Sequence, residues 1–306
     1  MQPYFSKFKQ MPLLMALIVI TPVIAPAQDY KPVKSDVFGR RYKAGETSRY
    51  RLTTEEIQNG NGASITTVVC ELKVVYDSTG IPYEEIHWLS KKKVTTKDTT
   101  DETKDALTVK PYRISLDPAG RIDLPKIEVP AMTGAVEDFN TFFVAVSPLI
   151  GATQLKSAGD TFEVKKPIKA DFSNGTTILN GEDCFTVFMK MTGNTKSTVM
   201  LHTAFMPTAQ PCLTYLLDEM KKPVVNDTAN NFQMVMPLGN DKYNVQYGRE
   251  MFYINSTVRK RDGKITFAEM NNTLTLHLKV FCDKNYSNCQ ADVPFTEQRN
   301  LKLELL

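Results

Sequence analysis

Three histidines are the side chains of this sequence best suited to acid–base chemistry: His87, His202 and His277. A histidine near its ordinary pKa activates a serine or cysteine nucleophile when a carboxylate holds its ring in place. Each of the three lies in a strand-like run, and no G-x-S-x-G or H-E-x-x-H motif accompanies any of them. We therefore predict satisfied or solvent-facing histidines and no enzymatic activity. The catalytic alternative is a hydrolase whose triad is assembled from distant strands.

Five cysteines raise the question of disulfides or a bound metal. Cys282 and Cys289 enclose a polar stretch typical of a turn, and this spacing predicts a disulfide between them. A zinc site would need paired ligands, but the chain has no C-x-x-C motif and only one histidine near this pair. We predict no metal site. The pairing of Cys70, Cys184 and Cys212 stays open.

Nucleotide cofactors and nucleic acids are not expected as partners. No G-x-G-x-x-G or Walker pattern follows a predicted strand, so no cofactor is predicted. Residues 1–27 hold two lysines and no acid, so 35 basic and 34 acidic residues remain after them. The basic runs at 91–93 and 259–261 are followed closely by acidic residues. Phosphate binding needs a concentrated excess of positive charge, which this balance does not supply.

Apolar side chains on two predicted short helices are the candidates for ligand contact. One helix is predicted from about Ala135 to Val146 and the other after Pro211, where Lys221 and Lys222 follow at its end. The residues predicted to line an apolar cavity are Phe139, Phe142, Phe143, Leu213, Leu217 and Met220. The alternative for the first helix is that its aromatic stripe packs as ordinary core against a sheet.

Alternation of apolar and polar residues with a period of two dominates the rest of the chain. Clear examples are the runs 68–76, 185–191, 199–205 and 274–282, rich in Val, Thr, Leu and Phe. The stretch Thr192–Asn194 predicts the turn between the second and third of these. We predict a mainly β fold of antiparallel meanders, forming a curved sheet or half-barrel or a two-part sandwich, with two short helices.

An internal repeat is suggested by two similar segments. Ala44–Thr47 recurs as Ala158–Thr161, and a cysteine follows 25 residues after each glycine, at Cys70 and Cys184. We interpret this as duplication, with a first β half over residues 28–150 and a second over residues 151–306, packed as one unit.

The segment 1–27 is typical of a cleaved secretory signal. Lys7 and Lys9 precede an apolar stretch, and Ala25-Pro26-Ala27 fits the small-x-small rule for cleavage. The apolar stretch is short for a membrane span, which needs roughly 20 residues. No cysteine adjoins the cleavage site, so we expect a free periplasmic or extracellular protein with no transmembrane segment after cleavage.

Several segments together resemble uncharacterised exported β-rich proteins of bacterial envelopes. They are Tyr42–Tyr50, Gly159–Phe162 and Asp262–Ile265. More distantly, the layout resembles the periplasmic lipoprotein-carrier superfamily, in which a curved sheet forms an open half-barrel closed by short helices over an apolar cavity. These motifs are turns, so no functional residue carries over, and the duplicated length departs from the single-domain carriers.

The leading hypothesis is a non-enzymatic exported protein with an apolar concavity that binds a lipid or another hydrophobic ligand. The alternative is a structural or protein-interaction module of the envelope without a small ligand.

Overall fold

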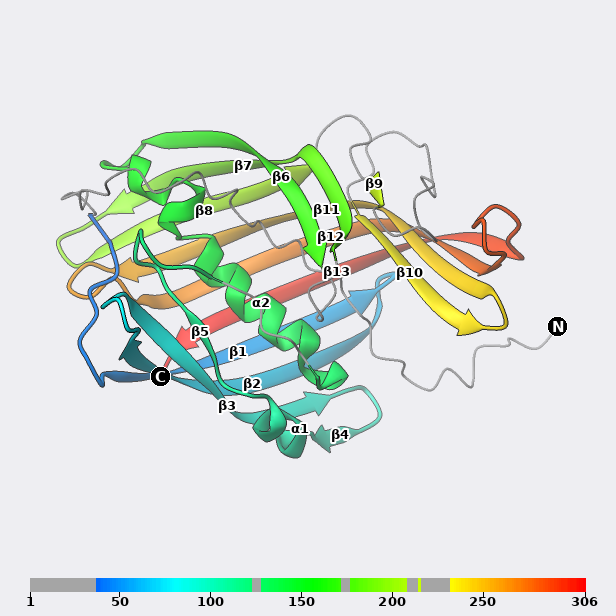
Figure 1. Ribbon diagram of the computed structural model, residues 1–306, viewed down its shortest axis with the longest axis horizontal. Helices are drawn as coiled ribbons and strands as arrows, with labels where there is room; N and C mark the ends of the chain where they lie inside the picture. Colours follow the sequence, from blue (N-terminus) through cyan, green and yellow to red (C-terminus); the bar gives the residue numbers. More distant parts are fainter. Residues whose placement is uncertain (1–36, 123–127, 172–176, 208–213, 216–231) are drawn as a thin grey trace.

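The computed structural model describes residues 37–122, 128–171, 177–207, 214–215 and 232–306. They form a mainly β fold built on one antiparallel sheet of thirteen strands (Figure 1). The strands are β1 (Thr47–Gln58), β2 (Asn61–Tyr76), β3 (Pro82–Val94), β4 (Thr99–Asp101), β5 (Tyr112–Ile114), β6 (Thr161–Asp171), β7 (Thr177–Asn194), β8 (Thr198–Pro207), β9 (Thr214–Tyr215), β10 (Phe232–Gly239), β11 (Lys242–Arg259), β12 (Ile265–Cys282) and β13 (Ala291–Leu305). The predicted mainly β class with antiparallel pairing is confirmed.

The sheet order brings the first and last described strands together. Its main path runs β4-β3-β2-β1-β13-β12-β11-β8-β7-β6, and β5, β9 and β10 pair with β3, β7 and β11. β1 pairs with β13 from Tyr50 opposite Leu305 to Gln58 opposite Glu297. A single curved sheet therefore contains strands from both predicted halves, while the duplication itself stays a prediction.

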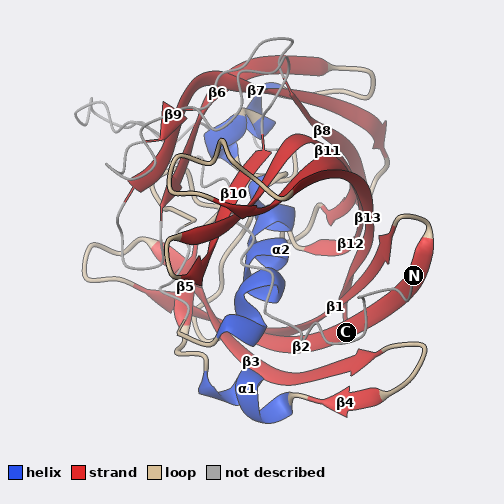
Figure 2. Ribbon diagram, turned by 90° about the vertical axis from the view of Figure 1, so that its right-hand side faces the viewer, coloured by secondary structure: helices blue, strands red, loops and turns tan. Residues whose placement is uncertain are grey.

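Helix α2 (Thr133–Val144) lies inside the curve of this sheet (Figure 2). Nine of its residues are buried, because it has the sheet on one side and connecting segments on others. It confirms the first predicted helix. Short 3₁₀ turns precede and follow it at Pro130–Met132, Pro148–Ile150 and Ala152–Gln154.

Most of the second predicted helix, after Pro211, lies outside the described residues. The two residues described there form strand β9 rather than a helix. Helix α1 (Thr103–Thr108), a six-residue helix beside β3, was not predicted from the sequence. Among the described residues, no helix is long and apolar enough to cross a membrane.

The inward side chains follow the predicted alternation. On β2 the residues Val68, Cys70, Leu72 and Val74 are all buried, and the corresponding runs of β7 and β8 are buried from Val187 onward. The predicted turn at Thr192–Asn194 is wrong. β7 continues to Asn194 with a register shift beside Gly193, and the turn lies at 195–197.

The two repeated glycine turns open equivalent strands. The Gly45 amide donates to the Val74 carbonyl, and the Gly159 amide donates to the Met191 carbonyl. Both glycines have positive φ, 71° and 96°, a conformation that side-chain-bearing residues rarely adopt. β1 and β6 begin two residues later in each case.

The repeated cysteine spacing does not mark equivalent places in the sheet. Five residues after each turn glycine stand Tyr50 and Val164, which lie opposite Cys70 and Val187 respectively. Because of an insertion, the equal spacing of the two cysteines in the sequence does not give them equal positions in the sheet. Cys70 is a buried free thiol.

The predicted disulfide between Cys282 and Cys289 is present. It closes the connection between β12 and β13, where the Asp283 carboxylate accepts hydrogen bonds from the Asn285 and Ser287 amides. The predicted signal segment 1–27 lies outside the described residues.

Candidate binding site

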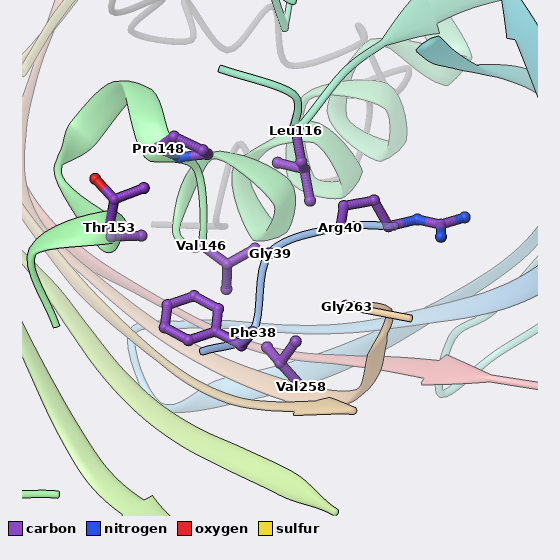
Figure 3. A pocket seen from close by; sticks show the side chains of 10 residues that line it. Phe38, Gly39, Arg40, Leu116, Val146, Pro148, Thr153, Val258 and Gly263 are labelled. Carbon is purple, nitrogen blue, oxygen red and sulfur yellow. The ribbon is translucent and has the colours of Figure 1, made fainter. Parts of the chain in front are cut away.

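The N-terminal strap, residues 37–41, closes one end of the curved sheet. A small cavity lies beside it, with Phe38, Val146 and Val258 in its wall (Figure 3). The guanidinium group of Arg40 points away from this cavity, as Figure 3 shows. The cavity has a volume of about 20 Å³, which is room for one water molecule. It is too small for a lipid chain.

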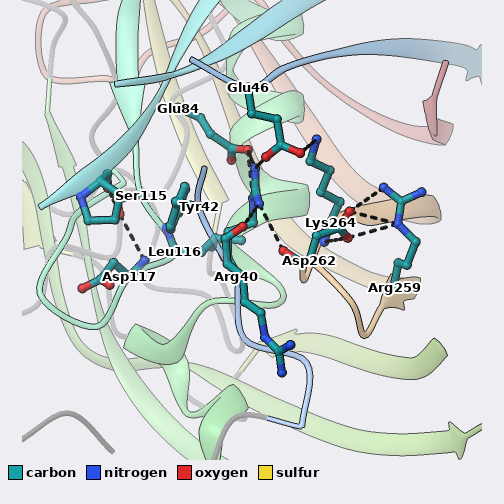
Figure 4. A network of polar contacts seen from close by, with 12 residues as sticks. Arg40, Tyr42, Glu46, Glu84, Ser115, Leu116, Asp117, Arg259, Asp262 and Lys264 are labelled. Atoms are coloured by element: carbon teal, nitrogen blue, oxygen red, sulfur yellow. Dashed lines mark hydrogen bonds and ion pairs between the residues drawn. The ribbon is translucent and has the colours of Figure 1, made fainter. Parts of the chain in front are cut away.

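A balanced group of charges fixes the strap to the sheet (Figure 4). We call it the strap cluster, and its members are Arg40, Glu46, Glu84, Arg259, Asp262 and Lys264. Arg40 lies 2.8 Å from Glu84 and 3.2 Å from Glu46, and Lys264 lies 2.9 Å from Glu46. Arg259 lies 2.7 Å from Asp262. Within the cluster three cations meet three carboxylates, and the exposed Arg261 lies 3.7 Å from Asp262 as well.

Hydrogen bonds lower the pKa values of two carboxyl groups in the strap cluster. Burial by itself would raise the pKa of Glu46, but Lys264 and Arg40 donate hydrogen bonds and bring that pKa below its ordinary value. The pKa of Asp262 is lowered in the same way by Arg259, again against the effect of burial. Burial raises the pKa of Glu84, and the neighbouring Arg40 offsets this rise only in part. Each carboxylate nevertheless lies beside a cation of the cluster.

A second polar group crosses the concave face beneath α2. We call it the belt, and its members are Glu56, Asp138, Glu250, Asn272, Glu297 and Arg299. Glu56 lies opposite Arg299, which lies opposite Asn272, so three neighbouring strands contribute to one row. Glu250 and Glu297 both lie opposite Leu274 in the next row. Asp138 reaches the belt from α2.

Arg299 is the belt's cation among the described residues. Its Nη2 lies 2.5 Å from Asp138 and its Nε lies 3.9 Å from Glu56. The Asn272 Nδ2 donates a 2.7 Å hydrogen bond to Glu250. Arg299 therefore lies against two of the belt's carboxylates, those of Asp138 and Glu56.

Burial raises the pKa values of three carboxyl groups in the belt. Burial raises the pKa of Glu297 to about 7; Arg299 opposes this rise, while Glu56, Glu250 and Asp138 add to it. Burial also raises the pKa of Asp138 and that of Glu250, although Arg299 and hydrogen bonds partly offset both. Perturbed carboxyl groups gathered in a concavity are a recognised mark of a functional site.

A small apolar group lies immediately beyond the belt. We call it the outer apolar cluster: Phe232, Leu274 and Leu276 are buried, with Met236 and Phe295 partly buried against them. The belt separates this cluster from the main core, which contains Met270 and Leu301. The concave face therefore changes from apolar to charged and back to apolar along the strands.

The predicted ligand-lining residues on α2 are part of the main core. Phe139, Phe142 and Phe143 are essentially unexposed. Phe139 packs edge-on against Tyr50 and Trp88, with ring centroids 6.0 and 5.6 Å apart. None of the three lines the small cavity. The other three predicted residues, Leu213, Leu217 and Met220, lie outside the described residues.

The three histidines sit in separate places on the sheet. His87 lies 3.1 Å from Glu85, His277 lies 3.0 Å from Asp292, and His202 lies 2.8 Å from the Asn255 side chain. Within the described ranges, no hydrogen bond joins any of these rings to a serine or cysteine. In the same part of the chain, no group of three or more His, Cys, Asp or Glu side chains is arranged to hold a metal ion.

The belt was not predicted from the sequence, although strand β13 contains a signal for it. On β13 the inward residues are Leu305, Leu303 and Leu301, followed at the same parity by Arg299 and Glu297. A charge at an inward position of a strand is unexpected unless it is paired or functional. Reading each strand for charges on its apolar face would have found Arg299 and Glu297.

Comparisons with known proteins leave the family open. Neither a protein-family model nor a curated protein matches the chain. One solved structure with some similarity is titled "Lipid-protein interactions in lipovitellin", with 11% identity, a TM-score of 0.36, and coverage of 87% of this chain and 25% of that one. The chain thus spans about a quarter of that protein's length. A likeness at this TM-score carries no argument about this chain, and the resemblance to lipoprotein carriers gains no support from these comparisons.

Proposed function

We propose that this protein is a non-enzymatic, exported binding protein that holds a hydrophobic ligand on its concave face where the belt meets the outer apolar cluster. The observation that carries the proposal is the position of Glu297, a buried carboxyl group without a donor among the described residues, directly beside an apolar surface. This location replaces the cavity under α2 that the sequence led us to expect.

The cost of the belt supports a role other than folding. Burying ionised groups is unfavourable unless each is paired and hydrogen-bonded. In the strap cluster the buried Glu84 has Arg40 2.8 Å away, whereas in the belt the buried Glu297 has no hydrogen-bond donor and no ion-pair partner among the described residues. Apolar side chains at these inward positions would stabilise the sheet better, so retention of the charges points to binding.

The neighbouring apolar surface suits a ligand with a hydrocarbon part. Phe295 lies two residues from Glu297 on the same face of β13, and Leu276 lies two residues beyond Leu274 on β12. Each square ångström of apolar surface removed from water contributes about 25 cal/mol. A short alkyl chain laid across these side chains therefore supplies useful affinity.

Export is consistent with the disulfide between Cys282 and Cys289. Such bonds persist in oxidising compartments and are rare in the cytosol. Together with the signal-like segment at residues 1–27, this supports the proposed periplasmic or extracellular location.

Native mass spectrometry of the purified protein, followed by extraction into organic solvent, tests the proposed function. We expect a co-purifying hydrophobic molecule, and we expect Phe295→Ser to reduce its occupancy. Phe267→Ser is the matched control, because Phe267 is 38% exposed on the opposite face of the sheet. A ligand-free mass for the wild type would favour the protein-interaction alternative.

A further inference from the structure

We propose that the ligand's polar group is a protonated amine, received by the Glu297 carboxylate and the Asn272 Oδ1, so that the protein binds cationic amphiphiles. This inference deepens the proposed function and rests on it. It names the head group, while the outer apolar cluster would hold the chain.

Glu297 is the first observation. Its side chain is only 3% exposed. Among the described residues, none donates a hydrogen bond to its carboxylate and none forms an ion pair with it. Its nearest charged neighbours on the sheet and on α2 are Arg299, Glu56, Glu250 and Asp138. Of these, Arg299 is the cation, and it lies directly against Asp138. Glu297 is therefore a buried acceptor without a donor in the described structure.

Asn272 is the second and independent observation. Its side chain is also 3% exposed, and its Nδ2 donates to Glu250, which places the amide inside the belt. The Oδ1 at the other end of that amide is buried and has no hydrogen-bond donor. A buried polar atom of this kind is unfavourable unless something supplies the missing bond. Two acceptors on neighbouring strands thus lack donors within one site.

An ammonium group fits this pattern better than other head groups. It offers three donors, no acceptor and a positive charge. A carboxylate or phosphate would place a second negative charge against the Glu297 carboxylate. A hydroxyl group would satisfy one acceptor and leave the charge uncompensated.

The distances along the strand suit an amphiphile. Residues two apart on a strand are about 6.6 Å apart, so a head group at Glu297 places the first carbons of its chain beside Phe295. Leu274, directly opposite Glu297, continues the same apolar surface. At the β1 end of the belt, the Glu56 side chain is 36% exposed.

Isothermal titration calorimetry with three probes of one chain length tests the inference: dodecylamine, dodecanoate and 1-dodecanol, each below its micelle concentration. We expect dodecylamine to bind at least about tenfold more tightly than the other two. At pH 7 its binding should release protons, because the ammonium group favours the ionised form of Glu297. Titration in buffers with different ionisation enthalpies measures that release.

Two matched variants locate the effect. Glu297→Gln should lower the affinity for dodecylamine about tenfold and abolish the proton release, with little change for 1-dodecanol. Glu304→Gln should change neither, because Glu304 lies on the same strand with its side chain on the opposite face. Thermal melts of both variants confirm that they fold.

The outcomes separate the two proposals. If none of the probes binds, the proposed function is wrong and this inference fails with it. If all three bind within twofold, if dodecanoate binds best, or if Glu297→Gln leaves dodecylamine binding intact, the protein binds hydrophobic ligands but the amine assignment is wrong.

Discussion

The strap cluster and the belt are both polar groups on one sheet, yet their carboxylates are partnered differently. In the strap cluster each carboxylate lies beside a cation; hydrogen bonds lower the pKa values of Glu46 and Asp262, while burial raises that of Glu84. In the belt burial raises the pKa values of Asp138, Glu250 and Glu297, and Glu297 has no ion-pair partner among the described residues. The difference distinguishes paired charges, which hold the fold together, from a carboxyl group whose ionisation the fold opposes.

The largest expected effect comes from breaking the strap cluster at Arg40. Arg40→Met leaves Glu84 buried without its cation and should reduce the free energy of unfolding by about 3–5 kcal/mol. The double variant Arg40→Met/Glu84→Met removes both charges and should recover most of that loss. Urea denaturation of the two variants measures the difference. A double variant as unstable as the single one would contradict the description of the cluster as compensated pairs.

The next effect has the opposite sign and lies in the belt. Glu297 has a pKa of about 7 in the folded protein against 4.5 for the free side chain, so its ionisation costs roughly 3 kcal/mol of stability. Because the folded pKa is the higher one, this stability is present below pH 4.5 and is lost as the pH rises to about 7. Glu297→Gln should therefore stabilise the protein at pH 8 and leave it unchanged at pH 4.

Chemical denaturation of Glu297→Gln at the two pH values measures this dependence. Equal stabilisation at both pH values would show that the surroundings of Glu297 do not raise the pKa of its carboxyl group.

A smaller loss should follow from displacing the strap. Gly263 has a φ of 69°, and a Cβ built on it would lie 2.3 Å from the carbonyl oxygen of Gly39. Gly263→Ala should cost about 2 kcal/mol, through the strained φ and the forced shift of the strap. Thermal unfolding checks the loss, and Gly80→Ala, also at positive φ but with open space around it, separates strain from contact. Equal losses in the two variants would remove the strap contact from the explanation.

The smallest expected effect is the loss of the Glu46 ion pair, and its pH dependence is opposite to that of Glu297. Glu46→Gln should cost about 1 kcal/mol near neutral pH, because a partly exposed ion pair contributes little. The folded pKa of Glu46 is lowered, so its contribution is present above the unfolded value and disappears as the pH falls through the folded one. Denaturation at pH 7 and pH 3 should show a loss only at the higher pH. A loss that grows in acid would contradict the ion-pair assignment.

Local patterns in the sequence were enough to predict much of the fold. Alternation identified the inward face of β2, and the Phe139, Phe142 and Phe143 spacing identified α2. The disulfide between Cys282 and Cys289 followed from a short spacing that one turn can close. Each of these depends on residues close together in the chain.

The candidate site was missed because it depends on contacts far apart in the chain. Asp138 and Arg299 are separated by 161 residues, and their contact between α2 and β13 follows from no local pattern in the sequence. The cysteine spacing misled for a related reason, since an insertion shifted the register between the two repeated strands. The predicted turn before Asn194 failed because Gly193 sits at a register shift and Met200 packs over it.

The pairing of β1 with β13 has a consequence for how the chain folds. The Asn300 side chain donates to Glu55 across 245 residues of sequence, so the middle of the sheet is completed only when the last strand arrives. Contacts of such high separation slow folding, because a large loop must close before they form. We expect the chain to stay unfolded long enough for translocation in an extended state. Arg299 and Glu297, which complete the belt, are then the last parts of the sheet to become ordered.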